Sequence, residues 1–405
     1  MMTSPPETEL RDGVLRVSAA LDPAAAPGRL PDRLWFEVDA SLAPFVRERA
    51  DAFAAVLHLP ALALGRPLDI LGPVSPALLG GIERRQEVFR RWSPPGLRPI
   101  EVRAAERRPA GPSGDGVLSS FSGGVDSFHT IWSRRPRDGA PAAGRVTDAV
   151  FLHGFDIPLD ERSAYERAAS AYEEVLAPLG VRLIRMRTNA RDLRGVTRWG
   201  LLHGAVLAAA PLLLGGLASR FLVPSTDNGR GRPWGTHPEL DPWLGTEALT
   251  VTLDGDERDR AGKVAEIMEW PEALENLRVC LRRSRSAVNC CRCEKCVRTM
   301  ILLDLAGGLA RGRAFPKRLR PRHVRRTRFE ENYVEGTDVV RLLLRRAWGA
   351  RRFDLVRDLC WSLLRSRLFP SGRGGAGRRP GAGVGSRLVA TSGGGRADVG
   401  IPAGG

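Results

Sequence analysis

The chain has 405 residues, with 62 Lys and Arg side chains against 46 Asp and Glu, and its formal charge at neutral pH is +16. Its length allows two or three domains, and 43% hydrophobic with 27% charged residues excludes a fibre or a wholly disordered chain. The charge suggests a nucleic acid or an anionic membrane as partner, but it is uneven. Residues 278–330 hold 16 basic and 3 acidic side chains, and residues 371–405 hold 5 and 1, so the rest of the chain is nearly neutral.

The N-terminal part predicts an α+β accessory domain over residues 1–110. It contains a strand-like piece at 34–38, a helical pattern at 45–57, an apolar piece at 68–74 and a helix-like run at 76–92. Residues 107–116 are rich in Pro and Gly and predict a linker. No basic start followed by an apolar run opens the chain, so no secretory signal is expected and we predict a cytoplasmic protein.

From residue 117 short apolar strands alternate with amphipathic helices, which predicts an α/β fold with an open parallel, doubly wound sheet over residues 117–270. The most apolar stretch, 201–224, approaches the roughly 20 residues of a membrane span. Because Gly215 and Gly216 divide it, we predict a buried helix followed by a buried strand, and no membrane. The predicted strands are 117–121, 149–152, 181–187, 221–223 and 249–253, and the predicted helices are 126–134, 162–176, 199–214 and 261–268.

The last part of the chain predicts a helical lobe over residues 278–370, followed by a tail. A helix is expected from about 294 to 305, because Gly307 and Gly308 follow it, and further helical patterns occupy 339–368. Residues 371–405 are rich in Gly and Arg without periodicity, and we expect them to be disordered. The dense basic run 311–328 is interpreted first as a solvated face.

The loop after the first strand of this α/β region carries the most specific chemistry. It consists of Ser122, Gly123, Gly124, Val125, Asp126 and Ser127, directly between a predicted strand and a predicted helix. At such a junction the free backbone N–H groups and the helix dipole favour an anion, and the two glycines allow it to approach closely. A carboxylate beside a phosphate requires a cation, so Asp126 indicates a nucleotide bridged by Mg²⁺.

Five of the six cysteines fall between residues 280 and 296. Two Cys-x2-Cys steps with a fourth, distant thiolate suit a tetrahedral zinc ion, with Cys280, Cys290, Cys293 and Cys296 as ligands. An iron–sulfur cluster is the main competitor, because this spacing also occurs in ferredoxins. Cys291 adjoins Cys290 and could replace it as a ligand, whereas the isolated Cys360 is expected in the core.

Residues 121–127, Phe-Ser-Gly-Gly-Val-Asp-Ser, resemble the SGGxDS signature of the PP-loop ATP pyrophosphatases, which are adenine nucleotide alpha hydrolase-like (HUP-like) enzymes. Together with the four cysteines and the Gly-Lys-x-x-Glu-Ile sequence at 262–267, they resemble the 7-cyano-7-deazaguanine synthase family over residues 117 to about 305. The resemblance implies that the loop binds the pyrophosphate end of ATP, and that zinc occupies the four-cysteine site. Asp126, Ser127 and Lys263 are then the expected catalytic residues.

The resemblance also implies an expected activity. It is an ATP-dependent ligase that forms AMP and pyrophosphate, activating a carboxylate or carbonyl for attack by ammonia or an amine. The expected partners are a small-molecule carboxylate and a nitrogen donor, with a homodimer considered and RNA left open. Two rivals remain: an RNA-modifying PP-loop enzyme similar to a tRNA thiolase, with an iron–sulfur or zinc site, and a non-catalytic module that senses ATP.

Other polar residues are candidates for substrate contact. His153 and Asp156 follow the second predicted strand, where loops of a parallel sheet line the ligand crevice. His237 and Asp241 lie four residues apart in a loop rich in Pro and Trp, and could contact substrate or a second metal. Lys263 is one of three lysines in a chain that otherwise uses arginine, which favours a point-charge role near phosphate. For all five, an ordinary structural role is the competing interpretation.

Overall fold

An eight-stranded sheet organises the chain, of which the computed structural model describes residues 1–92, 97–136, 144–226, 234–280, 289–329 and 336–368. Its strand order is β11-β10-β7-β8-β9-β4-β3-β2. The first five of these strands run parallel to one another. They are β7 (Gly116–Ser120), β8 (Asp148–His153), β9 (Arg182–Thr188), β10 (Ala218–Pro224) and β11 (Thr250–Asp254), close to where the alternating pattern predicted them.

The direction in which successive strands are added reverses at β7. Helices α3 (Val125–Ser133) and α4 (Arg162–Leu176) connect β7 to β8 and β8 to β9 on one side, and α5 (Trp199–Leu213) then returns the chain to β10 on the other side. In open α/β sheets the carboxyl ends of the strands at such a reversal form a crevice that commonly holds the ligand. The loop at residues 121–124, between β7 and α3, lies at this point.

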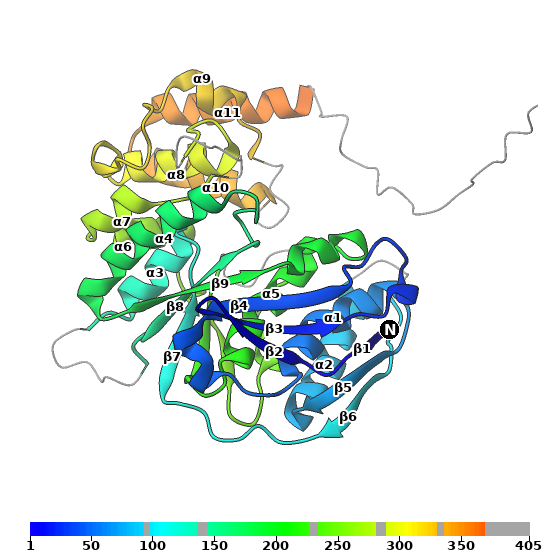
Figure 1. Cartoon of the computed structure of the whole chain (residues 1–405). Coiled ribbons are helices and arrows are strands. Elements are labelled where there is room, and N and C mark those ends of the chain that lie inside the picture. Colours follow the sequence, from blue (N-terminus) through cyan, green and yellow to red (C-terminus); the bar gives the residue numbers. More distant parts are fainter. Residues whose placement is uncertain (93–96, 137–143, 227–233, 281–288, 330–335, 369–405) are drawn as a thin grey trace, which may run out of the picture.

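Both faces of the parallel strands are buried, as their continuous apolar runs predict. Along β8, Ala149 and Phe151 face one core, while Val150 and Leu152 face the other. One face is covered by α1 (Asp51–Leu64), α2 (Pro76–Trp92) and α5, and the other by α3, α4, α6 (Arg260–Ile267) and α7 (Pro271–Asn276) (Figure 1). The apolar stretch at 201–224 is therefore a buried helix and strand, as predicted, and none of the described helices has the length and apolar character needed to span a bilayer.

The N-terminal region extends the same sheet, which corrects the expectation of a purely parallel one. Strands β2 (Glu7–Arg11), β3 (Val14–Ala20) and β4 (Arg33–Asp39) pair antiparallel with one another, and β4 pairs antiparallel with β9. The sheet is therefore mixed, because strand patterning in a sequence does not reveal which edge a distant strand joins. A second, parallel sheet consists of β1 (Met2–Thr3), β5 (Leu68–Val74) and β6 (Val102–Arg107).

The division of the chain into domains stays a prediction. The predicted boundary at residues 107–116 does not separate two sheets, because strands from both sides of it belong to the large sheet. The linker after β6 is held by Glu247, which lies before β11. Its carboxylate accepts hydrogen bonds from Ala110 N at 2.9 Å, from Ser75 Oγ at 2.7 Å and from Ala77 N, in the first turn of α2, at 3.0 Å. The predicted helix at 45–57 begins later, at Asp51, and Gly65 ends it with a φ of 63°.

The C-terminal lobe consists of α8 (Glu294–Leu305), α9 (Pro321–Arg326), α10 (Gly336–Gly349) and α11 (Phe353–Leu368) (Figure 1). Its apolar side chains join the core that covers the α3 and α4 face of the sheet. The prediction that Cys360 is a core residue is wrong, because α11 turns Leu355 and Leu359 inward and leaves Cys360 exposed. The tail predicted over 371–405 lies outside the described residues.

Candidate functional site

The loop between β7 and α3 forms a cradle of backbone groups. Gly123 has a φ of 73°, in the left-handed region that favours glycine. Ser122 Oγ accepts a hydrogen bond from Gly124 N at 3.3 Å, and Ser127 Oγ donates to Gly124 O at 3.1 Å. The first amides of α3 point out of the helix at the carboxyl edge of the sheet, so the loop can receive an anion.

A buried tyrosine lies directly beneath this loop. A Cβ added at Gly123 would lie 1.8 Å from Tyr172 Oη. Tyr172 is 2% exposed, and its ring packs edge-on against Phe121 and Phe151 at centroid distances of 5.1 and 5.2 Å. The glycine is therefore required for two reasons, the backbone conformation and the space that the tyrosine occupies.

Asp126, in the first turn of α3, is surrounded by cations. Its carboxylate lies 3.1 Å from Arg260 Nη1 and 3.5 Å from Lys263 Nζ, and Lys263 also donates to Ser225 O at 2.5 Å. The structure thus brings the predicted residues Asp126 and Lys263 together at the ends of β7 and β10. Arg260 was not predicted, because only the fold brings the first turn of α6 to this point.

The electrostatics of Asp126 include two further cations that the sequence analysis missed. Burial works to raise the pKa of Asp126, but four cations outweigh it and hold the pKa below its usual range: Arg260, Lys263, Arg298 and Lys295. Lys295 and Arg298 lie in the first two turns of α8, and Arg298 is 3% exposed and lies 3.3 Å from Glu294. Burial and the neighbouring Arg298 lower the pKa of Lys295. These cations carry more positive charge than the Asp126 carboxylate can balance, and unbalanced charge is costly to bury. The excess indicates a binding site for a multiply charged anion.

The four predicted cysteine ligands, Cys280, Cys290, Cys293 and Cys296, converge at the start of α8. Their sulfur atoms all lie within 4.8 Å of one another, with 3.9 Å between Cys290 and Cys296 and 4.0 Å between Cys280 and Cys293. A tetrahedral ion with Zn–S bonds of about 2.3 Å places its sulfurs about 3.8 Å apart. The four thiols can therefore hold one metal ion such as zinc.

The neighbouring Cys291 is not one of these ligands. It is buried, has a φ of 55°, and its sulfur lies 3.7 Å from Asn289 O. Asn289, which the sequence analysis missed, holds together the backbone segments that surround the cysteines. Its side chain accepts from Val279 N at 3.0 Å and donates to Leu277 O at 2.8 Å and Ala314 O at 2.9 Å.

The cysteine cluster and the anion loop are joined by the backbone. Arg278 N donates a hydrogen bond of 2.6 Å to Gly123 O, two residues before Cys280. Cys293 is the residue that precedes α8, and Cys296 lies in its first turn, between Lys295 and Arg298. A metal bound by the cysteines would therefore fix both the segment that touches the loop and the helix that carries its cations.

The predicted pair His153 and Asp156 divides between two roles. His153, at the end of β8, is buried, stacks on Tyr165 at 4.3 Å and makes a 2.8 Å hydrogen bond to Pro158 O. Burial lowers its pKa. Its partners are structural. Asp156 is exposed at the same edge of the sheet and lies close enough to Lys295 to raise the pKa of that amine against the effect of burial.

The predicted pair His237 and Asp241 lies beside α2, and the contacts described for it are there and not at the anion loop. Asp241 accepts from His237 N at 3.1 Å, and the ring of His237 packs against Trp92 at 4.6 Å. Burial raises the pKa of Asp241 to about 7, opposed by the buried Arg85. Arg85 donates to Leu240 O at 2.7 Å, so this cluster fastens the 237–241 loop to α2.

An aromatic cluster missed by the sequence analysis comes from the segments that follow β8, β9 and β10. Phe155 packs against Trp199, the first residue of α5, at 4.9 Å, and His203 packs against Trp234 at 5.0 Å. All four side chains are half-buried. Burial lowers the pKa of His203 to about 4, while Asp156 acts in the opposite direction. The only sequence signal was the proximity of these aromatics to predicted strand ends.

Comparison with protein-family models, with curated proteins and with solved structures finds no match for this chain.

Proposed function

We propose that this chain is an ATP-dependent adenylating enzyme of the PP-loop type, similar to 7-cyano-7-deazaguanine synthase. It activates a carboxylate or carbonyl group for attack by ammonia or an amine, and releases AMP and pyrophosphate. The observation that carries the proposal is the 122–127 loop at the strand-order reversal, with Asp126 among four cations. A structural turn has no need of so many charged groups, whereas a triphosphate with Mg²⁺ matches both the cations and the carboxylate.

Each part of the site has a role in this chemistry. The amides of residues 123–127 and the hydroxyls of Ser122 and Ser127 hold the β- and γ-phosphates, and Lys295, Arg298 and Arg260 offset their charge. Asp126 would hold a Mg²⁺ ion, which would offset phosphate charge, and Lys263, anchored on Ser225 O, keeps that carboxylate oriented. The four cysteines would hold a zinc ion, which would order the start of α8.

The proposed reaction proceeds by two displacements. A carboxylate oxygen of the substrate attacks the α-phosphorus of ATP, forming an acyl adenylate as the bond to the bridging oxygen breaks and pyrophosphate leaves. Ammonia or an amine then attacks the acyl carbon, AMP leaves with the bonding electron pair, and a proton is lost from nitrogen. The cations around Asp126 favour the first step because they stabilise the charge on the departing pyrophosphate.

The aromatic cluster of Phe155, Trp199, His203 and Trp234 is the best place for the acyl substrate. Its residues follow β8, β9 and β10, and it lies near the charged side chains of Asp156 and Lys295. Half-buried rings accept a planar or apolar group, and a neutral His203 can accept or donate one hydrogen bond.

The test is ATP–pyrophosphate exchange, measured over a panel of small carboxylates. Asp126→Ala should reduce exchange by at least about a hundredfold, because it removes the carboxylate that holds Mg²⁺. Asp32→Ala removes an exposed carboxylate far along the chain and should leave exchange unchanged. Exchange that persists in Asp126→Ala would exclude the proposed role of the loop.

The α8 cations give a second, independent readout. Lys295→Ala should weaken ATP binding about tenfold to a hundredfold, the value of a charge-assisted hydrogen bond to phosphate. Arg90→Ala removes the same charge from an exposed position in α2, outside both proposed sites, and is the matched control. Calorimetric titration with Mg²⁺ and ATP measures both, and equal affinities for the two variants would remove α8 from the nucleotide site.

A further inference from the structure

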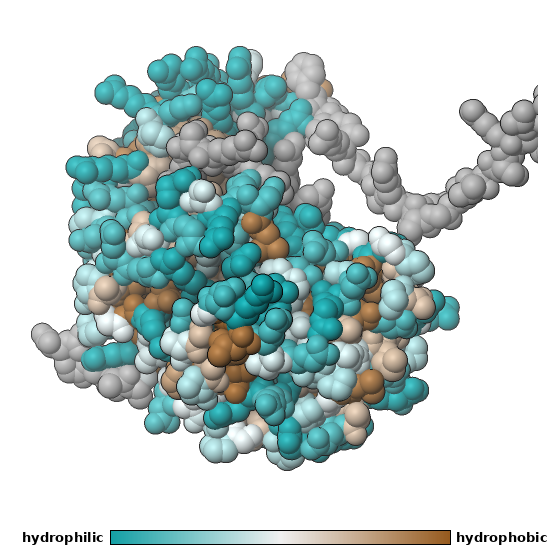
Figure 2. All heavy atoms as spheres, in the orientation of Figure 1, coloured by the Kyte–Doolittle hydropathy of each residue, from teal (hydrophilic) through white to brown (hydrophobic). Residues whose placement is uncertain are grey.

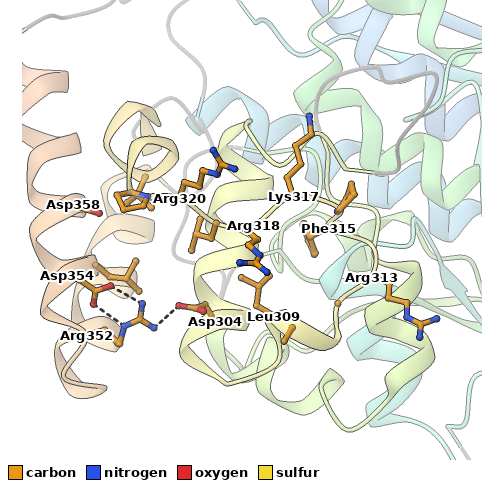
Figure 3. Close-up of a pocket in the computed structure, with 17 residues that line it drawn as sticks. Asp304, Leu309, Arg313, Phe315, Lys317, Arg318, Arg320, Arg352, Asp354 and Asp358 are labelled. Atoms are coloured by element: carbon orange, nitrogen blue, oxygen red, sulfur yellow. Dashed lines mark hydrogen bonds and ion pairs between the residues drawn. The ribbon is translucent and has the colours of Figure 1, made fainter.

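The C-terminal lobe contains a pocket that lies apart from the anion loop. It has a volume of about 710 Å³ and is lined by the 309–321 loop, by Asp304 at the end of α8 and by the first turns of α11 (Figure 3). The apolar part of its lining includes Leu309, Phe315 and Leu355. A pocket of this size accommodates a group as large as a nucleotide.

The acidic side chains of the pocket are all neutralised by arginines. Arg352 bridges Asp304 at 2.6 Å and Asp354 at 2.9 Å, as the dashed lines in Figure 3 show. Asp358, which is 2% exposed, pairs with Arg325 at 2.8 Å and with Arg357 at 3.3 Å. The carboxylates therefore do not make the pocket negative.

Of the remaining cations of the lining, Arg313 pairs with Glu275 at 3.5 Å, and three others can meet a ligand. Lys317, Arg318 and Arg320 are exposed, and within the described ranges no carboxylate forms an ion pair with any of them. In Figure 3 the guanidinium of Arg318 lies toward the middle of the pocket, while Lys317 and Arg320 extend toward its upper rim. Arg322 and Arg326 of α9 continue this exposed basic surface. On the face visible in Figure 2, hydrophilic residues cover most of the lobe.

Exposed aromatic rings accompany these cations. Asp354, Asp358, Trp361 and Arg365 follow one another at helical spacing along α11, so the stripe that lines the pocket continues to Trp361, which is 56% exposed. Arg365 reaches back to Arg326 O at 3.3 Å, which places this stripe beside α9. Phe353, between two lining residues, is also 56% exposed and packs edge-on against Trp348 at 5.5 Å.

We propose that this surface, residues 309–326 with the adjoining face of α11, binds single-stranded nucleic acid. Unpaired cations beside exposed aromatic rings are the combination that single-strand binders use, phosphates on the cations and bases on the rings. A concave pocket with an apolar floor can hold one base. A flat membrane surface could not enter such a pocket. The proposal goes beyond the small-molecule chemistry of the anion loop, since no residue is shared between the two sites.

The test uses the full chain and a fluorescent uridine oligonucleotide of about 12 nucleotides, a length within the site sizes of single-strand binders. Anisotropy titrations between about 50 and 200 mM salt give the affinity and its salt slope. Arg318→Glu combined with Arg320→Glu should weaken binding at least about tenfold and flatten the slope by about 1.4, or about 0.7 for each phosphate that is no longer neutralised. Trp361→Ala should weaken binding about 5- to 150-fold with little change in slope.

Matched controls carry the same changes elsewhere. Arg90→Glu with Arg98→Glu alters two exposed arginines of the N-terminal region, and Trp243→Ala removes a tryptophan that is 43% exposed. Both should bind as the wild type does, and the Arg-rich tail is common to all variants. The proposal is overturned if the wild type does not bind, if the two arginine pairs weaken binding equally, or if the chain binds vesicles with anionic lipid and not the oligonucleotide.

Discussion

Substitution of Gly123 tests how the anion loop is built, because a single added Cβ introduces both backbone strain and a steric clash. In Gly123→Ala the new Cβ lies 1.8 Å from Tyr172 Oη and 2.3 Å from its Cζ, while the backbone φ is 73°. The left-handed conformation costs about 1–2 kcal/mol for a residue with a Cβ. Displacing a packed ring costs about 1–3 kcal/mol more. We expect the free energy of unfolding to fall by about 2–5 kcal/mol.

The measurement is chemical unfolding of the full chain, followed by circular dichroism. Gly124→Ala is the matched control. Its φ is −84°, and its Cβ would lie 3.2 Å from Ser122 Oγ and 3.9 Å from Arg278 O, so a change within about 1 kcal/mol is expected. In a Tyr172→Leu background, Gly123→Ala should cost only the backbone strain of about 1–2 kcal/mol. The reasoning is refuted if Gly123→Ala costs no more than Gly124→Ala, or if the Tyr172→Leu background leaves its cost unchanged.

Two further predictions concern the metal and the response to acid. Cys293→Ser should abolish binding of one metal ion per chain and weaken ATP binding, because the cysteines fix the segment that is hydrogen-bonded to Gly123. The control Cys360→Ser should alter neither property. Equal metal contents of the two variants would disprove the assignment. Three hydrogen bonds hold the pKa of Glu247 at about 2 against partial burial, below its usual 4.5. Its stabilising effect is therefore complete above pH 4.5 and is lost as the pH falls toward 2. Glu247→Gln should be less stable than the wild type at pH 7, by about 1 kcal/mol, and equally stable near pH 2; a difference that does not vary with pH would refute this.

Much of the α/β region followed from local patterns. The strands at β7 to β10 have short apolar runs between turn residues, and the anion loop has Gly123 at a position with a positive φ. Such signals depend only on neighbouring residues, which is why the sequence alone placed the loop between β7 and α3. The four cysteines were predictable for the same reason, since thiolate spacing within one short segment reflects the geometry of a single ion.

The partners of Asp126 were not predictable in the same way. Arg260 lies 134 residues after Asp126 in the sequence, and Arg298 lies further still. Only tertiary packing brings these residues together. In a chain with 62 Lys and Arg side chains, no single arginine stands out by composition. Lys263 was identified because lysine is rare in this chain. His237 and Asp241 showed the opposite failure, since polar residues at a suggestive spacing proved to fasten a loop to α2.

The antiparallel ribbon β2–β4 has a consequence for where the large sheet ends. Without it, β9 would present a row of unsatisfied backbone groups at the margin of the strands that carry the anion loop. The ribbon transfers that open margin to β2, whose five residues are all exposed and include Glu7, Glu9 and Arg11. Charged side chains on an outermost strand discourage other strands from adding to it. The chain thus brings its own stop to sheet growth, and shortening it to begin at β7 would remove that protection along with the cover that α1 gives to α5.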